Sequence, residues 1–218
     1  MGIASRRKID AMALQKRISI NGELAEPGDK IDPDTDTIVV DKKIIPLRQL
    51  ADQELVYYLL NKPKYVLSTS SDDRGRDTVL NYVPKTPRVF PVGRLDYEST
   101  GLIILTNDGD LALRLTHPRY HLPKTYLVTV LGKVTPLTIS QMNATGAKTK
   151  KVSSQYNQTT LEIILFQGKK RQIRLMCSKL HLHVVDLRRI SIGPINIGSL
   201  TSGKYRLPTP REISALKK

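Results

Sequence analysis

GRLDYESTGLIILTNDG, residues 93–109, is the stretch of this chain that decides its fold. Its first part is a short polar segment around one carboxylate, Asp96, and its second part, residues 102–105, is a continuous apolar run closed by a turn signal. This pattern predicts a loop that leads into a buried strand. Gly93 and Gly101 permit tight backbone conformations, and the strand fixes the exit of the loop. A loop held in this way is a rigid support for a reactive group, which makes Asp96 the first candidate functional residue.

An aspartate in a loop is most often a turn former or a helix cap, and spacing alone favours that interpretation. The longer pattern GRLDxxxxGLxxLTNDG, however, resembles the signature of the RsuA-type ribosomal RNA pseudouridine synthases. The match is ungapped, so it is far more specific than a short glycine motif. The resemblance implies that Asp96 is the catalytic aspartate of such an enzyme.

Length and composition predict a soluble cytoplasmic protein. The 218 residues, 39% of them apolar, suffice for a medium domain and a small one. No apolar run reaches the roughly 18 residues of a membrane span, and the segment MGIASRRKID lacks the apolar region of a signal peptide. The single cysteine, Cys177, excludes an intramolecular disulfide and is typical of a reducing compartment.

The charge is unevenly placed along the chain. The formal net charge is +15, yet residues 1–52 hold 9 basic and 9 acidic side chains, and residues 53–117 hold 8 of each. Residues 118–218 hold 18 basic and 3 acidic side chains, so the whole excess lies there. Such an excess predicts that the second half faces a polyanion such as RNA, with salt-sensitive binding.

Residues 1–45 are predicted to form a separate module. A helix with Ser5 as its cap is expected near the start, followed by an Asn-Gly turn at residues 21–22 and a strand at residues 37–40. GIASRRK followed by RISINGELAEPGDKI resembles the RNA-binding domain named after ribosomal protein S-four, without the helix that usually precedes this segment. Residues 46–53 are expected to be a linker, and residues 54–218 the catalytic domain.

Four further segments extend the resemblance over nearly the whole chain. LVYYLLNKPKYVLST contains an expected strand over residues 55–60, KTYxV is an alternating strand, GKKRQIRLM opens a helix expected from residue 170, and HLHVVDLRRI follows it. By themselves, a strand tyrosine is ordinary packing and a helix arginine is solvated. The resemblance instead implies three catalytic residues, Asp96, Tyr126 and Arg174, and six residues on the substrate side: Lys62, Arg94, Arg171, Leu187, Arg188 and Arg189.

The chemistry of such an enzyme explains these residue types. Converting uridine to pseudouridine breaks the bond from ribose to the base nitrogen, turns the base and rejoins it through carbon 5. The reaction needs a carboxylate as nucleophile or base, and the resemblance implies that Asp96 supplies it. Arg174 is expected to pair with Asp96 and to favour its charged form. Tyr126 stacks on the uracil above an apolar wall that includes Leu187, and Arg94 fills the vacated stack or holds a phosphate after base flipping.

The roles of the remaining residues follow the same resemblance. Lys62 belongs to a Lys-Pro pair that structures the edge of the cleft, and Arg188 and Arg189 are expected near RNA phosphates. No step needs an electron sink, so neither a cofactor nor a metal is expected. The four histidines have no acidic or cysteine partners at zinc-like spacing.

The expected fold is α+β, with a mixed, mostly antiparallel sheet and flanking helices. The polar residues 145–158 are expected to be a solvated hairpin or loop. The expected partner is ribosomal RNA or a pre-ribosomal particle, with no membrane, and the protein is expected to be a monomer. DDRGRDTVLNYVP resembles the branch that acts on the large subunit. The alternative is a catalytically silent RNA-binding assembly factor, which has no chemical reason to keep Asp96, Tyr126 and Arg174 together.

Overall fold

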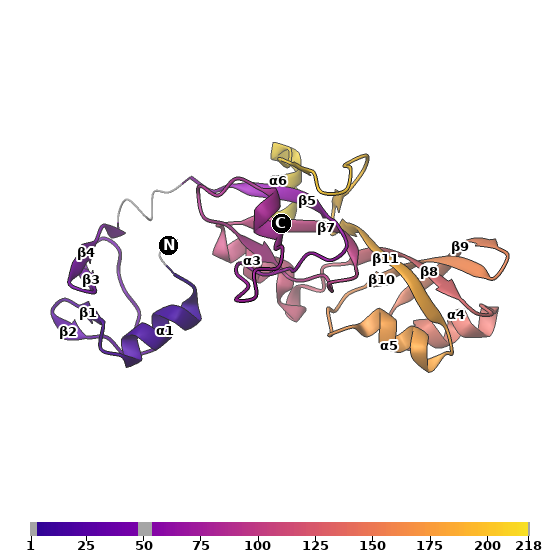
Figure 1. The fold of residues 1–218 in the computed structure, drawn as a ribbon, viewed down its shortest axis with the longest axis horizontal. Coiled ribbons are helices and arrows are strands. Elements are labelled where there is room, and N and C mark those ends of the chain that lie inside the picture. Colours follow the sequence, from indigo (N-terminus) through magenta and orange to yellow (C-terminus); the bar gives the residue numbers. More distant parts are fainter. Residues whose placement is uncertain (1–3, 48–53, 218) are drawn as a thin grey trace. The chain divides into compact units, whose positions relative to one another are not determined.

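The computed structural model describes residues 4–47 and 54–217, which form two compact units, Met1–Leu55 and Val56–Lys218 (Figure 1). Most of the linker expected at residues 46–53 therefore lies outside the described residues. Leu47, at its start, is buried in the core of the first unit.

The N-terminal unit is a helix beside a small sheet. Its elements are α1 (Arg6–Leu14), β1 (Ile18–Ile20), β2 (Glu23–Leu24), β3 (Ile38–Val40) and β4 (Lys43–Ile45), in the strand order β2-β1-β3-β4. Ser5 caps α1, because its hydroxyl accepts from the N–H of Lys8 at 3.3 Å, as the sequence predicts. Asn21 and Gly22 both have positive φ, 51° and 89°, and form the predicted turn between β1 and β2.

The second unit is built on one sheet. Its strands are β5 (Tyr57–Lys62), β6 (Phe90–Val92), β7 (Thr100–Thr106), β8 (Lys124–Leu131), β9 (Lys148–Gln155), β10 (Gln158–Leu165), β11 (His183–Ile192), β12 (Ile195–Asn196) and β13 (Tyr205–Arg206). The order is β13-β5-β7-β11-β8-β10-β9, with β6 added to β7 and β12 to β11. Among the described strands the β7–β11 pair is parallel and the others are antiparallel. The predicted mixed, mostly antiparallel sheet is confirmed.

Helices cover both faces of this sheet (Figure 1). They are η1 (Val79–Tyr82), α3 (Gly109–Thr116), η2 (Pro118–Tyr120), α4 (Pro136–Asn143), α5 (Gln172–Lys179) and α6 (Pro210–Lys217). The core on one face includes residues of α4 and α5, and the core on the other includes residues of α3 and α6. No helix in the described part of the chain is long and apolar enough to cross a membrane.

The central position of β7 explains its unbroken apolar run. Successive side chains of a strand point to opposite faces of the sheet. Leu102 and Ile104 pack in the core that contains α3 and α6, whereas Ile103 and Leu105 pack in the core that contains α4 and α5. All four are completely buried, because both faces of β7 are covered.

Gly101 allows β11 to run directly beside β7. Its φ is +106°, and an added Cβ would lie 2.2 Å from the carbonyl oxygen of Arg189. Arg189 is the residue paired with Gly101 in the parallel ladder. The glycine at the end of the Asp96 loop therefore brings the side chains of β11 to that loop.

Two elements differ from the sequence prediction, and a third agrees with it. The strand expected at residues 55–60 is shifted to β5, which places Lys62 inside it. The helix expected from residue 170 begins at Gln172, because Arg171 has left-handed backbone angles (φ 52°). The solvated hairpin or loop expected at residues 145–158 is a hairpin: residues 148–155 form the mostly exposed edge strand β9, which pairs antiparallel with β10 and has a register shift opposite Thr160 and Leu161.

Candidate active site

A cleft of about 640 Å³ lies where the Asp96 loop, β8, β11 and the turn before α5 meet. The loop enters from β6 and leaves into β7, so two paired strands hold its ends. The cleft is lined by seven basic side chains, Arg94, Lys124, Lys169, Lys170, Arg171, Arg174 and Arg189, against one acid, Asp96. Its size suits a nucleotide, and its charge suits a polyanion.

Asp96 and Arg174 meet in this cleft from positions 78 residues apart. Arg174 Nε lies 3.8 Å from Asp96 Oδ2, and Arg174 Nη2 lies 3.7 Å from Glu98 Oε2. The arginine side chain is 14% exposed and the aspartate 33%, so the carboxylate is open to a substrate while its partner is covered. Arg174 Nε has no hydrogen-bond partner, so the two groups face each other as a loose ion pair. Such contacts often tighten when a substrate enters.

The apolar stripe of α5 explains the placement of Arg174. Ile173, Met176 and Cys177 are buried in the core, which fixes the rotation of the helix. Arg174 then lies on the flank of the helix that faces the Asp96 loop.

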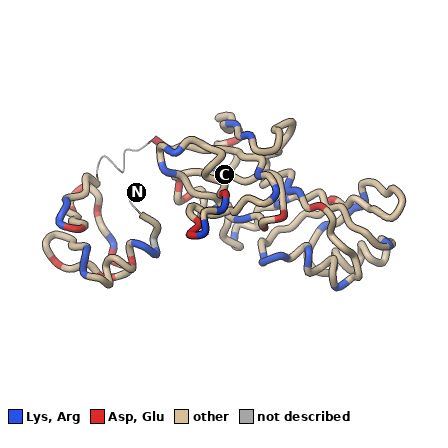
Figure 2. Tube along the Cα trace, in the orientation of Figure 1, with Lys and Arg blue, Asp and Glu red and all other residues tan. Residues whose placement is uncertain are grey.

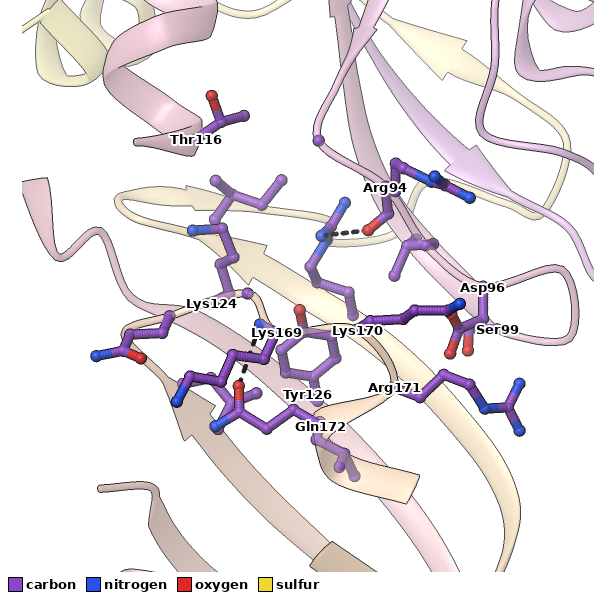
Figure 3. Close-up of a pocket in the computed structure, with 18 of the residues that line it drawn as sticks. Arg94, Asp96, Ser99, Thr116, Lys124, Tyr126, Lys169, Lys170, Arg171 and Gln172 are labelled. Atoms are coloured by element: carbon purple, nitrogen blue, oxygen red, sulfur yellow. Dashed lines mark hydrogen bonds between the residues drawn. The ribbon is translucent and has the colours of Figure 1, made fainter. Parts of the chain in front are cut away.

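Tyr126 and Leu187 contribute apolar surface to the cleft. They lie on the paired strands β8 and β11 and are 8% and 5% exposed. In Figure 3 the Tyr126 ring lies across the middle of the cleft, with Asp96 on one side and Lys124 on the other. A flat aromatic surface beside a carboxylate is an arrangement that can hold a planar base.

Lys124 is a lining residue that the sequence analysis missed. It precedes Tyr126 by two positions in β8, so the two side chains lie on the same face of the sheet. Strand periodicity was therefore the signal that pointed to it. Burial, with the nearby charge of Arg189, lowers the pKa of Lys124, and its Nζ donates to the carbonyl of Leu122 at 3.2 Å.

Arg94 and Arg171 are exposed lining residues, as expected for contacts with RNA. Arg94 belongs to the Asp96 loop, and Arg171 to the turn that precedes α5 (Figure 3). These two basic groups lie on opposite sides of Asp96 in the sequence but line the same cleft.

Arg188 and Arg189 lie in different surroundings. Arg189 is only 3% exposed; its Nε donates to the carbonyl of Leu102 at 2.7 Å and its Nη1 to that of Arg94 at 3.4 Å. This buried side chain lines the cleft and braces the Asp96 loop against β7, and its expected position near RNA phosphates stays a prediction. Arg188 lies between two cleft residues of β11, so its side chain points to the opposite face of the sheet, outside the cleft.

Lys62 is completely buried and does not line the cleft, which does not support its place among the predicted substrate-side residues but agrees with the structural role predicted for the Lys-Pro pair. Its Nζ donates to the carbonyl oxygens of Pro63 and Ser99, both at 2.8 Å, and of Tyr97 at 3.5 Å. Ser99 and Tyr97 belong to the Asp96 loop. The lysine therefore fastens that loop to the end of β5. Burial lowers the pKa of Lys62 to about 8, although the negative charge of Asp96 opposes the shift.

This pKa predicts a pH-dependent stability. A lysine with a folded-state pKa of about 8 and an ordinary value of 10.5 contributes stability that is present above 10.5 and lost as the pH falls through 8. Relative to Lys62→Met, the wild-type free energy of unfolding should rise by about 3 kcal/mol between pH 8 and pH 10.5. Urea unfolding of both proteins across this range measures the difference. A constant difference would show that the buried amine does not change its charge on folding.

Ser68 is a third anchor of the Asp96 loop, and one that the sequence did not predict. Its Oγ donates to the carbonyl of Leu95 at 2.9 Å and accepts from the N–H of Leu95 at 3.1 Å. The residue before Asp96 is thus held through both of its backbone polar groups, which keeps the carboxylate in place.

The acidic residues of the basic second half are all paired. Lys150 binds Glu162 at 2.9 Å, Lys64 binds Asp186 at 3.0 Å, and Arg206 binds Glu212 at 2.7 Å. Residues 118–218 hold 18 basic side chains and these 3 acidic ones, as the blue and red segments of Figure 2 show, so most of the basic groups there are available to an anion. Within residues 4–47 and 54–217, no group of three or more His, Cys, Asp or Glu side chains is placed to hold a metal ion.

Comparison with known proteins gives a consistent result. The profile of the family described as RNA pseudouridylate synthase matches residues 56–179. An RNA pseudouridine synthase of Aquifex aeolicus is 39% identical over 100% of this chain and 90% of its own length. The ribosomal large subunit pseudouridine synthase B of Bacillus subtilis is 33% identical over 99% of this chain and 91% of its own length.

Two further similarities concern specificity and structure. The dual-specificity RNA pseudouridine synthase RluF of Escherichia coli is 37% identical over 100% of this chain and 75% of its own length. A crystal structure of a pseudouridylate synthase superposes with a TM-score of 0.69 and 27% identity, and covers 97% of this chain and 94% of the other.

Proposed function

This chain belongs to the RNA pseudouridylate synthase family and is an isomerase, and we propose that it converts a specific uridine of ribosomal RNA to pseudouridine with Asp96 as the catalytic carboxylate. The observation that carries the proposal is the meeting of Asp96 and Arg174 at 3.8 Å in a basic cleft that Tyr126 also lines. No cofactor is part of the proposal, because the isomerisation is redox-neutral.

Asp96 acts at the ribose of the target nucleotide, as nucleophile or as base, while the bond to the base nitrogen breaks. Its partial exposure, 33%, leaves the carboxylate accessible from the cleft. Arg174 lies close enough to stabilise the carboxylate charge. The braces from Lys62 and Arg189 keep the loop from moving as the base detaches.

The detached uracil stays in the cleft while it turns. Tyr126 offers a ring face for stacking, and Leu187 closes the wall beside it. The enclosed uracil is rejoined through carbon 5 before water can intervene.

The target uridine must leave its stack to reach Asp96, at a cost of a few kcal/mol. Arg94 is exposed beside Asp96 and fills the vacated position or holds the adjacent phosphate. Lys169, Lys170 and Arg171 line the same cleft and bind neighbouring phosphates.

Large-subunit ribosomal RNA is the proposed substrate, alone or in a pre-ribosomal particle. The name of the Bacillus subtilis relative, which includes the large subunit, and the resemblance of DDRGRDTVLNYVP support this choice. The N-terminal unit is proposed to add RNA affinity, because exposed basic residues, Arg7 and Lys8, lie on α1.

Arg174→Met should lower kcat about a hundredfold, because the charge facing Asp96 is lost, while leaving KM within about threefold. Arg171→Met, at the cleft mouth, should mainly raise KM. Single-turnover and steady-state assays on the same RNA separate the two effects. Equal kcat for both variants would contradict a role for Arg174 at Asp96.

Pseudouridine mapping of 16S and 23S ribosomal RNA transcripts tests the function. Each transcript is incubated with the wild type or with Asp96→Asn, then treated with carbodiimide and read by reverse transcription. A stop made by the wild type and absent with Asp96→Asn is the expected result, and its position names the uridine. If neither protein makes a new stop, and both bind RNA equally, the silent assembly-factor alternative is correct.

A further inference from the structure

Two exposed tyrosine rings stand together beside Asp96. Tyr65 is 62% exposed and Tyr97 is 42% exposed, and their ring centroids lie 5.5 Å apart at an angle of 57°. Tyr97 directly follows Asp96 in the chain, yet neither ring lines the cleft itself. The pair therefore forms an apolar surface next to the cleft, to which no role has yet been assigned.

The backbone couples this pair to the catalytic loop. The N–H of Tyr65 donates to the carbonyl of Tyr97 at 2.7 Å, and the N–H of Ser99 donates to the carbonyl of Asp96 at 3.0 Å. The buried Nζ of Lys62 donates to the Tyr97 and Ser99 carbonyl groups. A ligand that rests on the rings would therefore sit on a support that is rigid with respect to Asp96.

Tyr65 has a backbone conformation that an aromatic residue rarely adopts. Its φ is +64°, in the left-handed region where glycine is favoured. Packing does not account for a large side chain here, since most of the ring is exposed. A strained residue beside an active site points to a use for its side chain.

We propose that Tyr65 and Tyr97 form a stacking platform for an unpaired base of the substrate RNA, next in sequence to the target uridine. Every base has a π face, and exposed aromatic side chains are the surfaces on which proteins hold splayed RNA bases. The position of the rings beside Asp96 favours an RNA base as the ligand, because a nucleotide that flanks a uridine bound at Asp96 lies close to them. The platform thus contributes to the choice of uridine. This inference rests on the proposed function, because it needs an RNA substrate in the cleft.

The test uses a hairpin RNA that spans the mapped uridine and the full-length protein. Tyr65→Gly and Tyr97→Ala should each lower kcat/KM about tenfold, the effect of losing one stacked base. Tyr65→Gly should keep or raise the melting temperature, because glycine fits φ +64° without strain. An activity loss without a stability loss separates stacking from a structural role.

A matched control is available in the same unit. Tyr156, in the turn between β9 and β10, also has positive φ (51°) and is fully exposed, but it does not line the cleft. Tyr156→Gly should match Tyr65→Gly in melting temperature and the wild type in kcat/KM.

Abasic nucleotides identify the stacked base. At one of the positions flanking the uridine, an abasic substitution should lower wild-type kcat/KM about tenfold and have no further effect on Tyr97→Ala. The proposal is overturned if both tyrosine variants retain the wild-type kcat/KM, or if Tyr156→Gly lowers kcat/KM as much as they do. It is also overturned if the abasic substitution lowers the kcat/KM of Tyr97→Ala by a further tenfold. If the wild type converts no uridine, the proposed function itself fails. Filter binding of 16S and 23S fragments then tests the platform separately, and equal RNA affinity of the wild type and the tyrosine variants overturns it.

Discussion

Asp96→Asn is expected to lower the rate of pseudouridine formation by at least about a thousandfold, as is typical when an essential reactive group is removed. An amide has nearly the same shape as a carboxylate but neither attacks the ribose nor accepts its proton. The braces on the loop use backbone carbonyls of Tyr97 and Ser99, so they remain in the variant. The loss should therefore appear in kcat and not in folding.

Tritium release measures this loss. Rejoining the base through carbon 5 releases the hydrogen of that carbon, so RNA labelled there with tritium reports each turnover. The melting temperature and the RNA dissociation constant of Asp96→Asn should match those of the wild type. A variant that keeps more than about a tenth of the wild-type rate would remove Asp96 from the chemistry.

Gly101→Ala is the second substitution with a large expected effect, about 3 kcal/mol or more of lost stability. The added Cβ would lie 2.2, 2.7 and 2.9 Å from backbone atoms of Arg189, and the φ of +106° is unfavourable for alanine. Backbone atoms of a central strand cannot rotate away as a side chain can. The parallel β7–β11 pair must open, which also separates Leu187 from the Asp96 loop.

Gly109→Ala is the matched control for this substitution. Gly109 is the first residue of α3, and nothing lies within 4 Å of an added Cβ. Alanine there should leave the free energy of unfolding unchanged or raise it by up to about 1 kcal/mol. Urea unfolding measures both, and hydrogen exchange of the β7 and β11 amides localises the damage. Equal stability of the two variants would mean that β11 can shift away from β7 at little cost.

The sequence alone was informative wherever the signal is local. Ser5 and the Asn-Gly turn of the N-terminal unit lie where cap and turn chemistry predicted them. The apolar run at residues 102–105 is the buried strand it was predicted to be. Each of these signals depends on contacts within a few residues.

The candidate site was predictable only in part, through a resemblance that spans several segments. Asp96, Tyr126, Arg174 and Leu187 were identified this way, and the fold brings them to one cleft. Their catalytic roles stay predictions until the assays above are done. Lys124 was within reach of strand periodicity, because it lies two positions before Tyr126.

Burial and pairing across the sheet decided the rest. Lysine and arginine side chains are exposed to solvent in most proteins, and no residue next to Lys62 or Arg189 in the chain indicates that these two are buried. Lys62 is buried because β5 lies beside β7, whose preceding loop offers it carbonyl groups from residues 35 and 37 positions away. Arg189 is buried because Gly101 allows β11 to lie close to β7. There it donates to the carbonyl of Leu102, a residue 87 positions away in the chain.

The sequence by itself therefore determined the fold class and several local elements, because residue type and spacing encode them directly, and the family resemblance named the candidate reactive groups. Only the tertiary structure decided which basic side chains are exposed in the cleft and which brace the loop. It also placed Tyr65 beside Tyr97, 32 positions later, through a hydrogen bond between two turns. The physical reason is that solvation is a property of the assembled sheet: the same type of charged side chain is exposed at one position and buried against backbone carbonyl groups at another.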